Sequence, residues 1–306
     1  MEMAWIILKQ TLTMGLYMAA GFALYKCGKI TQEGSRTLAQ VLIFLIIPVV
    51  LVKSFCVECT PERLSMLGWS FLLATIAMFL SMAVASIIYR KHPIDRFAAT
   101  FSNAGFIGIP LVTAALGGGV VFYLCGFLMW INILQWTWGS AVIKREKMSL
   151  NPKTLFCNVF MFATALGLIL FFTNLGTKLP GVITGAMEGI ANLNGPIAML
   201  IMGVYLAQTK LSKLFNTPRL YALSAVRMWL IPLLTLLIFA VLPAANDIRM
   251  TILISASAPV GANVAVYAQL YDSDYPYACQ TVALSTVASI VMLPLFILLA
   301  TFVLGM

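Results

Sequence analysis

The sequence predicts an all-α integral membrane protein, and composition is the first reason. Of its 306 residues, 61% are hydrophobic and only 9% are charged, whereas soluble domains carry about a quarter charged residues. Apolar stretches of about 20 residues recur, each long enough to cross a bilayer as a helix. The alternating short strands of a membrane barrel are missing from the pattern. The first apolar stretch is itself of span length, so it does not resemble a cleaved signal.

Ten transmembrane helices are expected from these stretches. They cover residues 4–25, 37–55, 65–89, 95–118, 120–143, 153–173, 183–208, 219–242, 249–271 and 275–304. Thirteen of the nineteen lysines and arginines fall at or beside the odd-numbered loops. Because positive charge marks the cytoplasmic side, both termini are predicted outside the inner (cytoplasmic) membrane. The net charge of +9 is then a topology signal and not a nucleic-acid patch.

Matched prolines indicate two inverted halves. Pro196 follows Pro48 by 148 residues, and Pro259 follows Pro110 by 149 residues. A basic linker, KREKMSLNPK at 144–153, divides the chain near its middle. Five spans per half is an odd number, so the second half must be inverted relative to the first. The predicted units are residues 1–147 and residues 148–306.

Helix-breaking residues occur inside the fourth and ninth spans. The stretch NAGFIGIP at 103–110 contains Gly108 and Pro110, and SASAPVGANV contains Pro259 and Gly261. Proline lacks an N–H and collides with the preceding turn, so each stretch is expected to break its helix. Unwound backbone cannot face lipid and must face protein or a wet cavity. The two broken helices are therefore expected to cross near the midplane, where secondary transporters bind substrate.

These two stretches resemble motifs of the auxin efflux carrier family. NAGFIGIPL resembles Asn-x-x-x-x-Gly-Ile-Pro-Leu, and ASAPVGANVAVYAQLYD resembles the ninth-span motif at Pro259, Gly261 and Ala268. The family includes plant PIN carriers and bacterial malonate-type transporters, and a bacterial member is the nearer resemblance. The long central loop of most plant members is absent, and Val260 stands where they have glutamine.

The resemblance implies an architecture. Spans 1, 2, 6 and 7 would form a scaffold that dimerises with a second copy. Spans 3–5 and 8–10 would form a transport domain that carries the crossing helices and moves like an elevator.

Five polar side chains inside spans are candidate substrate ligands. Asn103 either caps a free carbonyl at the break or holds a substrate oxygen, and the same alternatives apply to Asn263. Asn132 and Gln135 lie one helical turn apart, and either face the site or pack against a neighbouring helix. Arg227 lies about two turns inside the eighth span. It either contacts substrate or snorkels to the cytoplasmic surface.

The expected function is secondary transport of a small organic anion by alternating access. Each new half-helix N-terminus exposes N–H groups without intrahelical partners and carries about half a positive charge. Two such ends favour a carboxylate, with Gly108, Pro110, Pro259 and Gly261 shaping the site. The alternatives are a channel and a transporter-like receptor of a small molecule.

Other classes of function find little support in the sequence. Cys56 and Cys59 are too few for a closed zinc site, and the lone His92 lies far along the chain. The cysteine pair is a disulfide or two free thiols. No phosphate-binding loop or catalytic triad can be assembled. We therefore expect no enzyme activity, no metal or cofactor, and no nucleic-acid partner.

Overall fold

The structure is a computed structural model that describes residues 2–148, 159–209, 214 and 216–306. Helices account for all the regular structure there, apart from one isolated β-bridge between Ser102 and Val260. Short 3₁₀ or π stretches, labelled η, join several of the helices. The elements are α1 Glu2–Lys26, α2 Gln32–Val41, η1 Leu42–Ile46, α3 Ile47–Ser54, α4 Pro61–Ile88, α5 Pro93–Thr100, η2 Ala104–Gly108, α6 Ile109–Leu116, η3 Gly118–Leu124, α7 Cys125–Leu134, η4 Gln135–Gly139, α8 Ser140–Lys144, α10 Val159–Phe172, η5 Gly176–Lys178, α11 Gly181–Asn192, α12 Asn194–Gln208, α14 Pro218–Ala225, η6 Val226–Leu230, α15 Ile231–Val241, α16 Asn246–Ser257, α17 Asn263–Leu270 and α18 Tyr275–Val303.

Six helical stretches in the described residues are long and apolar enough to cross a membrane. They are Gln32–Ser54, Pro61–Ile88, Gly118–Lys144, Gly181–Gln208, Pro218–Val241 and Tyr275–Val303. Each coincides with one of the ten predicted spans to within a few residues. An all-helical, multi-pass membrane protein is therefore supported, with six candidate spans rather than ten.

The other four predicted spans differ from a single apolar helix in identifiable ways. The span at 4–25 is one helix, α1, whose Lys9 and Gln10 dilute its apolar character. The span at 153–173 is described only from residue 159, as the short α10. The spans at 95–118 and 249–271 are each interrupted, at 101–103 and at 258–262. An interrupted stretch contains only short helices, which by themselves do not reach across a bilayer.

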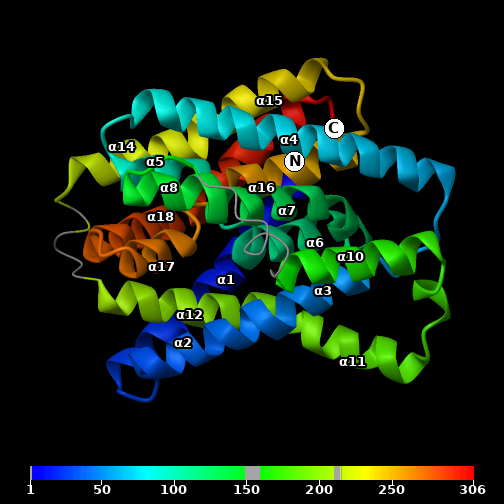
Figure 1. Cartoon of the computed structure of the whole chain (residues 1–306), viewed down its shortest axis with the longest axis horizontal. Helices are drawn as coiled ribbons and strands as arrows, with labels where there is room; N and C mark the ends of the chain where they lie inside the picture. Colours follow the sequence, from blue (N-terminus) through cyan, green and yellow to red (C-terminus); the bar gives the residue numbers. More distant parts are fainter. Residues whose placement is uncertain (1, 149–158, 210–213, 215) are drawn as a thin grey trace.

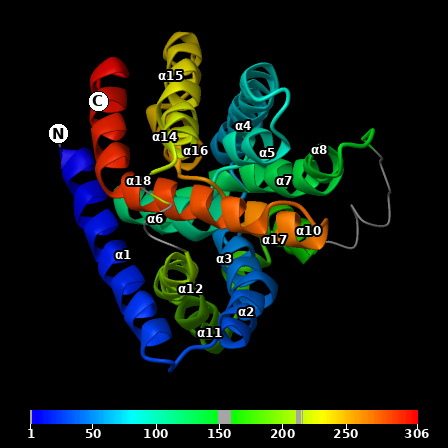
Figure 2. The same ribbon diagram turned by 90° about the vertical axis from the view of Figure 1, so that its left-hand side faces the viewer.

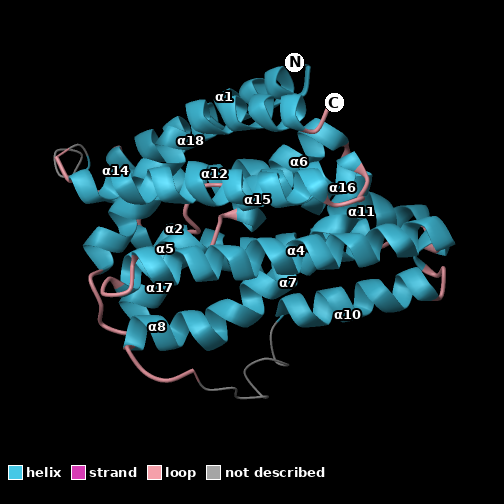
Figure 3. Ribbon diagram, turned by 90° about the horizontal axis from the view of Figure 1, so that it is seen from above, coloured by secondary structure: helices cyan, strands magenta, loops and turns pink. Residues whose placement is uncertain are grey.

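The helices form layers that place the two interruptions in the interior. Figures 1 and 2 show α2, α3, α11 and α12 on one side of the molecule and α4, α5, α14 and α15 on the other. Between them lie α6, α17 and α18. Helix α1 packs along α12 and α18. Both ends of the chain lie close together in all three views, including that of Figure 3.

Prolines follow three of the four π stretches in the described chain. Pro48 follows η1, Pro110 follows η2 and Pro232 follows η6, each at the second residue after the stretch. A proline inside a helix lacks an N–H and its ring collides with the carbonyl four residues earlier. A π turn widens the helix at that point and accommodates the ring. These prolines therefore deform their helices without ending them.

Thiol labelling tests the predicted orientation. Cys27 is exposed, whereas Cys56 and Cys59 are partly buried and unpaired. We expect a membrane-impermeant maleimide on intact cells to label the Cys56–Cys59 region and to spare Cys27. Burial raises the pKa of the Cys56 thiol, so Cys59 is expected to react first. The Cys27→Ser variant provides the control, and labelling of Cys27 alone would reverse the orientation.

Part of the topology prediction lies outside the described residues. This part comprises the basic residues at 153, 210 and 213 and residues 149–153 of the linker.

Candidate functional site

The two interrupted helices meet and pair through their backbones. The Asn103 N–H donates to the Pro259 carbonyl at 2.8 Å, and the Gly261 N–H donates to the Phe101 carbonyl at 2.9 Å. These bonds flank the antiparallel bridge between Ser102 and Val260, and the Val260 N–H donates to Ser285 Oγ at 3.1 Å. Backbone polar groups inside a membrane need internal partners. The interruptions supply those partners to each other.

This close approach of the two segments favours glycine at position 261. A Cβ atom placed there would lie 3.1 Å from the Ser102 carbonyl oxygen and 3.2 Å from that of Phe101. Both neighbours are backbone atoms, which cannot rotate away. The prediction of a break at Pro259–Gly261 agrees with the interruption at 258–262.

The predicted break in the fourth span, at Gly108–Pro110, is misplaced by about two helical turns. The structure interrupts the helix at Phe101–Asn103, and helical structure resumes at Ala104, before Gly108 and Pro110. The Asn103 carbonyl already accepts the N–H groups of Ile107 and Gly108. Pro110 needs no break, because the π turn of η2 precedes it.

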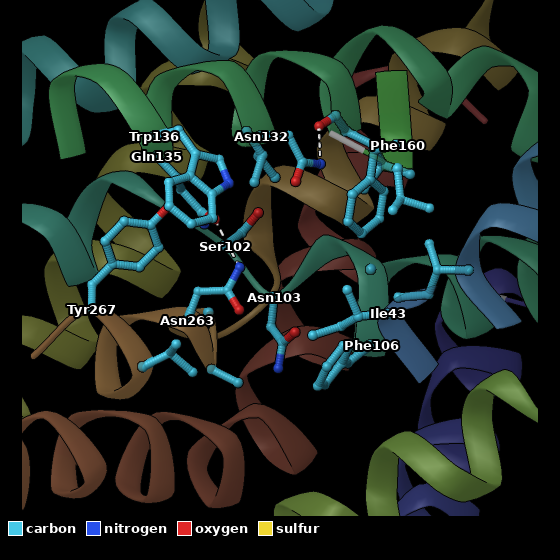
Figure 4. Close-up of a pocket in the computed structure, with 18 of the residues that line it drawn as sticks. Ile43, Ser102, Asn103, Phe106, Asn132, Gln135, Trp136, Phe160, Asn263 and Tyr267 are labelled. Atoms are coloured by element: carbon cyan, nitrogen blue, oxygen red, sulfur yellow. Dashed lines mark hydrogen bonds between the residues drawn. The ribbon is translucent and has the colours of Figure 1, made fainter. Parts of the chain in front are cut away.

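A cavity of about 530 Å³ lies against the crossing segments. Figure 4 shows its polar side chains gathered around one space, from α7, η4, α17 and the interrupted fourth span. It brings together five of the nine predicted site residues: Asn103, Asn132, Gln135, Gly261 and Asn263. The full lining is Ile43, Phe44, Ile47, Ser102, Asn103, Gly105, Phe106, Leu128, Ile131, Asn132, Gln135, Trp136, Val159, Phe160, Gly261, Ala262, Asn263, Val266, Tyr267 and Leu270. We call this space the crossover cavity.

The amide side chains in the crossover cavity differ in how fully they are engaged. Asn263 Nδ2 donates to Gln135 Oε1 at 2.7 Å, which joins α17 to η4 (Figure 4). Asn132 Nδ2 donates to the Leu128 carbonyl of its own helix at 2.8 Å. Asn103 is 5% exposed, and within the described part of the chain its amide donates only to the Met202 sulfur, at 3.9 Å. Sulfur is a weak acceptor, so Asn103 is the amide with the most unused hydrogen-bonding capacity.

Ser102 and Tyr267 were missed by the sequence reasoning. Both line the crossover cavity, and the hydroxyl of each is buried without a hydrogen-bond partner in the described structure. Buried polar atoms without partners are uncommon in native proteins. A signal was available, since Ser102 precedes Asn103 and Tyr267 follows Asn263 by one helical turn.

The start of the η2–α6 half-helix faces the same cavity. Asn103, Gly105 and Phe106 all line it. The first N–H groups of a helix have no intrahelical partner, and the N-terminus carries about half a positive charge. In α17 the first turn is partly satisfied, since Val264 and Ala265 donate to Gly261 and Ala262.

A second cavity of about 680 Å³ lies further along the same helices. It touches Pro110 and Thr113 of α6, beyond the residues that face the crossover cavity. Asn194, at the start of α12, lines it and donates to the Gly105 carbonyl at 3.2 Å. The full lining is Gln10, Thr13, Tyr17, Val50, Lys53, Ser54, Val57, Ile109, Pro110, Thr113, Ala114, Gly118, Gly119, Val121, Ala191, Asn192, Asn194, Gly195 and Pro196.

Three predicted site residues therefore lie away from the crossover cavity. Pro110 belongs to the second cavity. Gly108 packs against α16, where an added Cβ would lie 3.2 Å from Ser255 Oγ. Pro259 lies in the crossing segment, and its carbonyl is engaged by Asn103.

Arg227 also lies outside both cavities, and the snorkelling alternative is wrong. Its side chain is 1% exposed and lies in η6. The guanidinium donates to four backbone carbonyls in or next to the crossing segments: Ala99 at 3.0 Å, Thr100 and Ala258 at 3.3 Å each, and Ala256 at 2.5 Å.

Residues 196–305 match the model of the Sodium Bile acid symporter family. Over 300 residues the chain is 27% identical to an "Uncharacterized transporter" of Methanothermobacter thermautotrophicus, an alignment that covers 90% of this chain and 92% of that protein.

These matches correct the family prediction. The predicted resemblance to the auxin efflux carrier family is wrong, because the family model that matches, over residues 196–305, is that of the Sodium Bile acid symporter family. The scaffold and elevator assignments came from that resemblance and lose their support with it. Both matched names describe transporters and not enzymes. Together with the apolar helices, they support a multi-pass membrane transporter.

Proposed function

We propose that this protein is a secondary transporter that moves a small organic anion, a carboxylate, by alternating access. One observation carries the proposal. A half-helix N-terminus and a set of uncharged hydrogen-bonding side chains face one cavity at the crossing of two interrupted helices. Secondary transporters place substrate at interrupted helices of this kind.

The chemistry of the crossover cavity favours an anion over a cation. None of its described lining residues is acidic, so a cationic substrate would meet only neutral oxygens. An anion would meet the first N–H groups of η2 and the amide of Asn103. It would also meet the hydroxyls of Ser102 and Tyr267, which have no hydrogen-bond partner among the described residues. Helix N-termini bind carboxylates without an adjacent basic side chain.

The arrangement of the two cavities favours a carrier over a channel. They share no lining residue, and they follow one another along η1–α3 and along η2–α6. The buried Ile107, 2% exposed, lies between the stretches of the half-helix that face each cavity. A channel needs a continuous polar path.

The proposal includes ten crossings in two inverted halves, residues 1–147 and 148–306, so that each half contributes one interrupted helix.

A ligand-binding screen tests the substrate class. Purified protein is screened by thermal shift with acetate, malonate and succinate, with their amides, and with amines of equal size. We expect carboxylates to raise the melting temperature and the amides and amines to leave it unchanged. Tight binding of an amine, with carboxylates inert, would contradict an anionic substrate. Saturable counterflow of the best carboxylate in liposomes then separates a carrier from a channel and from a receptor.

Asn103→Ala is expected to weaken binding of that carboxylate by about 1–3 kcal/mol, because a buried hydrogen bond to an anion is lost. Asn132→Ala is the matched control, since Asn132 already bonds to the carbonyl of Leu128 on its own helix. Isothermal titration of both folded variants measures the difference. If Asn103→Ala bound the carboxylate with wild-type affinity, Asn103 would have a role only in the backbone interruption and not in substrate binding.

A further inference from the structure

Two half-helices end, as well as begin, at the crossover. Helix α5 ends at Thr100 and helix α16 ends at Ser257. The last carbonyls of a helix lack intrahelical partners, and each C-terminus carries about half a negative charge. Two such ends at one place therefore attract about one unit of positive charge. In transporters with interrupted helices, half-helix C-termini and unwound carbonyls coordinate the coupling cation.

In this protein a side chain supplies that positive charge. The carbonyls of Ala99 and Thr100 belong to the end of α5, and those of Ala256 and Ala258 belong to the end of α16 and the residue after it. All four accept hydrogen bonds from the Arg227 guanidinium. All three guanidinium nitrogens, Nε and the two terminal ones, donate hydrogen bonds to these carbonyls.

Carbonyl dipoles alone compensate the buried charge. Arginine remains protonated in proteins, and a buried charge is costly unless it is paired. No acidic side chain forms an ion pair with Arg227 in the part of the chain that the structure describes. The two helix ends are therefore its counter-charge.

The same carbonyls do not fit a sodium ion while Arg227 is in place. Sodium would need these oxygens as ligands, and it would lie against a full positive charge with no acid between them. The name of the matched family includes sodium, but the residues present here disagree with a sodium site at the crossover.

We propose that the Arg227 guanidinium is a built-in cation that occupies the carbonyl site of a coupling cation, so that this protein works without sodium. This inference rests on the proposed transport function, because a coupling cation has a role only in a transporter. It concerns a permanent structural charge that holds the ends of α5 and α16 together in place of a bound ion.

The wild-type protein provides the first test. Its melting temperature is measured while sodium chloride is replaced stepwise by choline chloride at constant ionic strength. We expect no change across the series. A sodium ion at about 100-fold excess over its dissociation constant would raise the melting temperature by several degrees. A saturable rise of that kind would overturn the proposal.

Two variants provide the second test. Arg227→Ala removes the charge and leaves space beside the carbonyls, and Arg227→Met removes the charge but fills the space. We expect both to melt several degrees below wild type. Methylguanidinium should restore the melting temperature of Arg227→Ala saturably, with no such effect on Arg227→Met or wild type. Arg227→Met as stable as wild type, or Arg227→Ala without rescue, would show that the charge is unnecessary.

The sodium series does not depend on whether either Arg227 variant folds. If neither variant is recovered folded, the sodium series on the wild-type protein still decides the proposal. None of these measurements uses a carboxylate. A failure of carboxylates to bind would contradict the proposed function and leave the result for Arg227 unchanged.

Discussion

Replacing Gly261 with valine is expected to abolish carboxylate binding and counterflow while the protein still inserts into the membrane. The added atoms would press on the carbonyl oxygens of Ser102 and Phe101, only 3.1 and 3.2 Å from a Cβ at this position. The two crossing segments must then separate. Separation breaks the Gly261–Phe101 and Asn103–Pro259 backbone bonds, and each unsatisfied group in the membrane interior costs several kcal/mol.

Counterflow in liposomes and thermal shift with the best carboxylate measure this effect. Gly68→Val is the matched control, because a Cβ at Gly68 in α4 would meet nothing within 4 Å. Reduced transport in both variants would indicate a general loss of fold. Normal binding in Gly261→Val would show that the paired interruptions do not form the substrate site.

Replacing Gly21 or Gly203 with valine is expected to lower stability more than any substitution in the crossover cavity. Helices α1 and α12 approach so closely that a Cβ at Gly21 would lie 2.2 Å from the Leu200 carbonyl oxygen. One at Gly203 would lie 2.0 Å from that of Met18. Small residues at helix interfaces allow this approach in membranes. Overpacking costs typically about 1–3 kcal/mol, and a collision with backbone exceeds that range.

The yield of monodisperse protein after extraction, followed by its melting temperature, measures the effect of each glycine substitution. Gly15→Val in the same helix is the control. A Cβ at Gly15 would meet only the mobile end of Ile290, at 3.4 Å. Equal loss in Gly15→Val and Gly21→Val would assign the effect to helix propensity and not to the α1–α12 contact.

The helical class and most helix positions could be predicted from the sequence because they depend on local properties. A run of apolar residues long enough to span a bilayer must be helical to satisfy its backbone. The ends of Pro61–Ile88 and Pro218–Val241 therefore agree closely with prediction. The family assignment went wrong because it rested on two short stretches rich in glycine and proline, and such residues serve any interrupted helix.

Only the tertiary structure decided which polar groups meet. Five of the predicted site residues share a cavity, but Pro110 faces a second cavity and Gly108 packs against Ser255. The break in the fourth span lies at Phe101–Asn103 because Pro259 and Gly261, more than 150 positions away in the chain, pair with it there. Arg227 could be read from the sequence as a surface or substrate residue. The carbonyls that hold it come from the ends of two helices that are far apart in the chain. Its role as an internal cation therefore depends on contacts that no local pattern encodes.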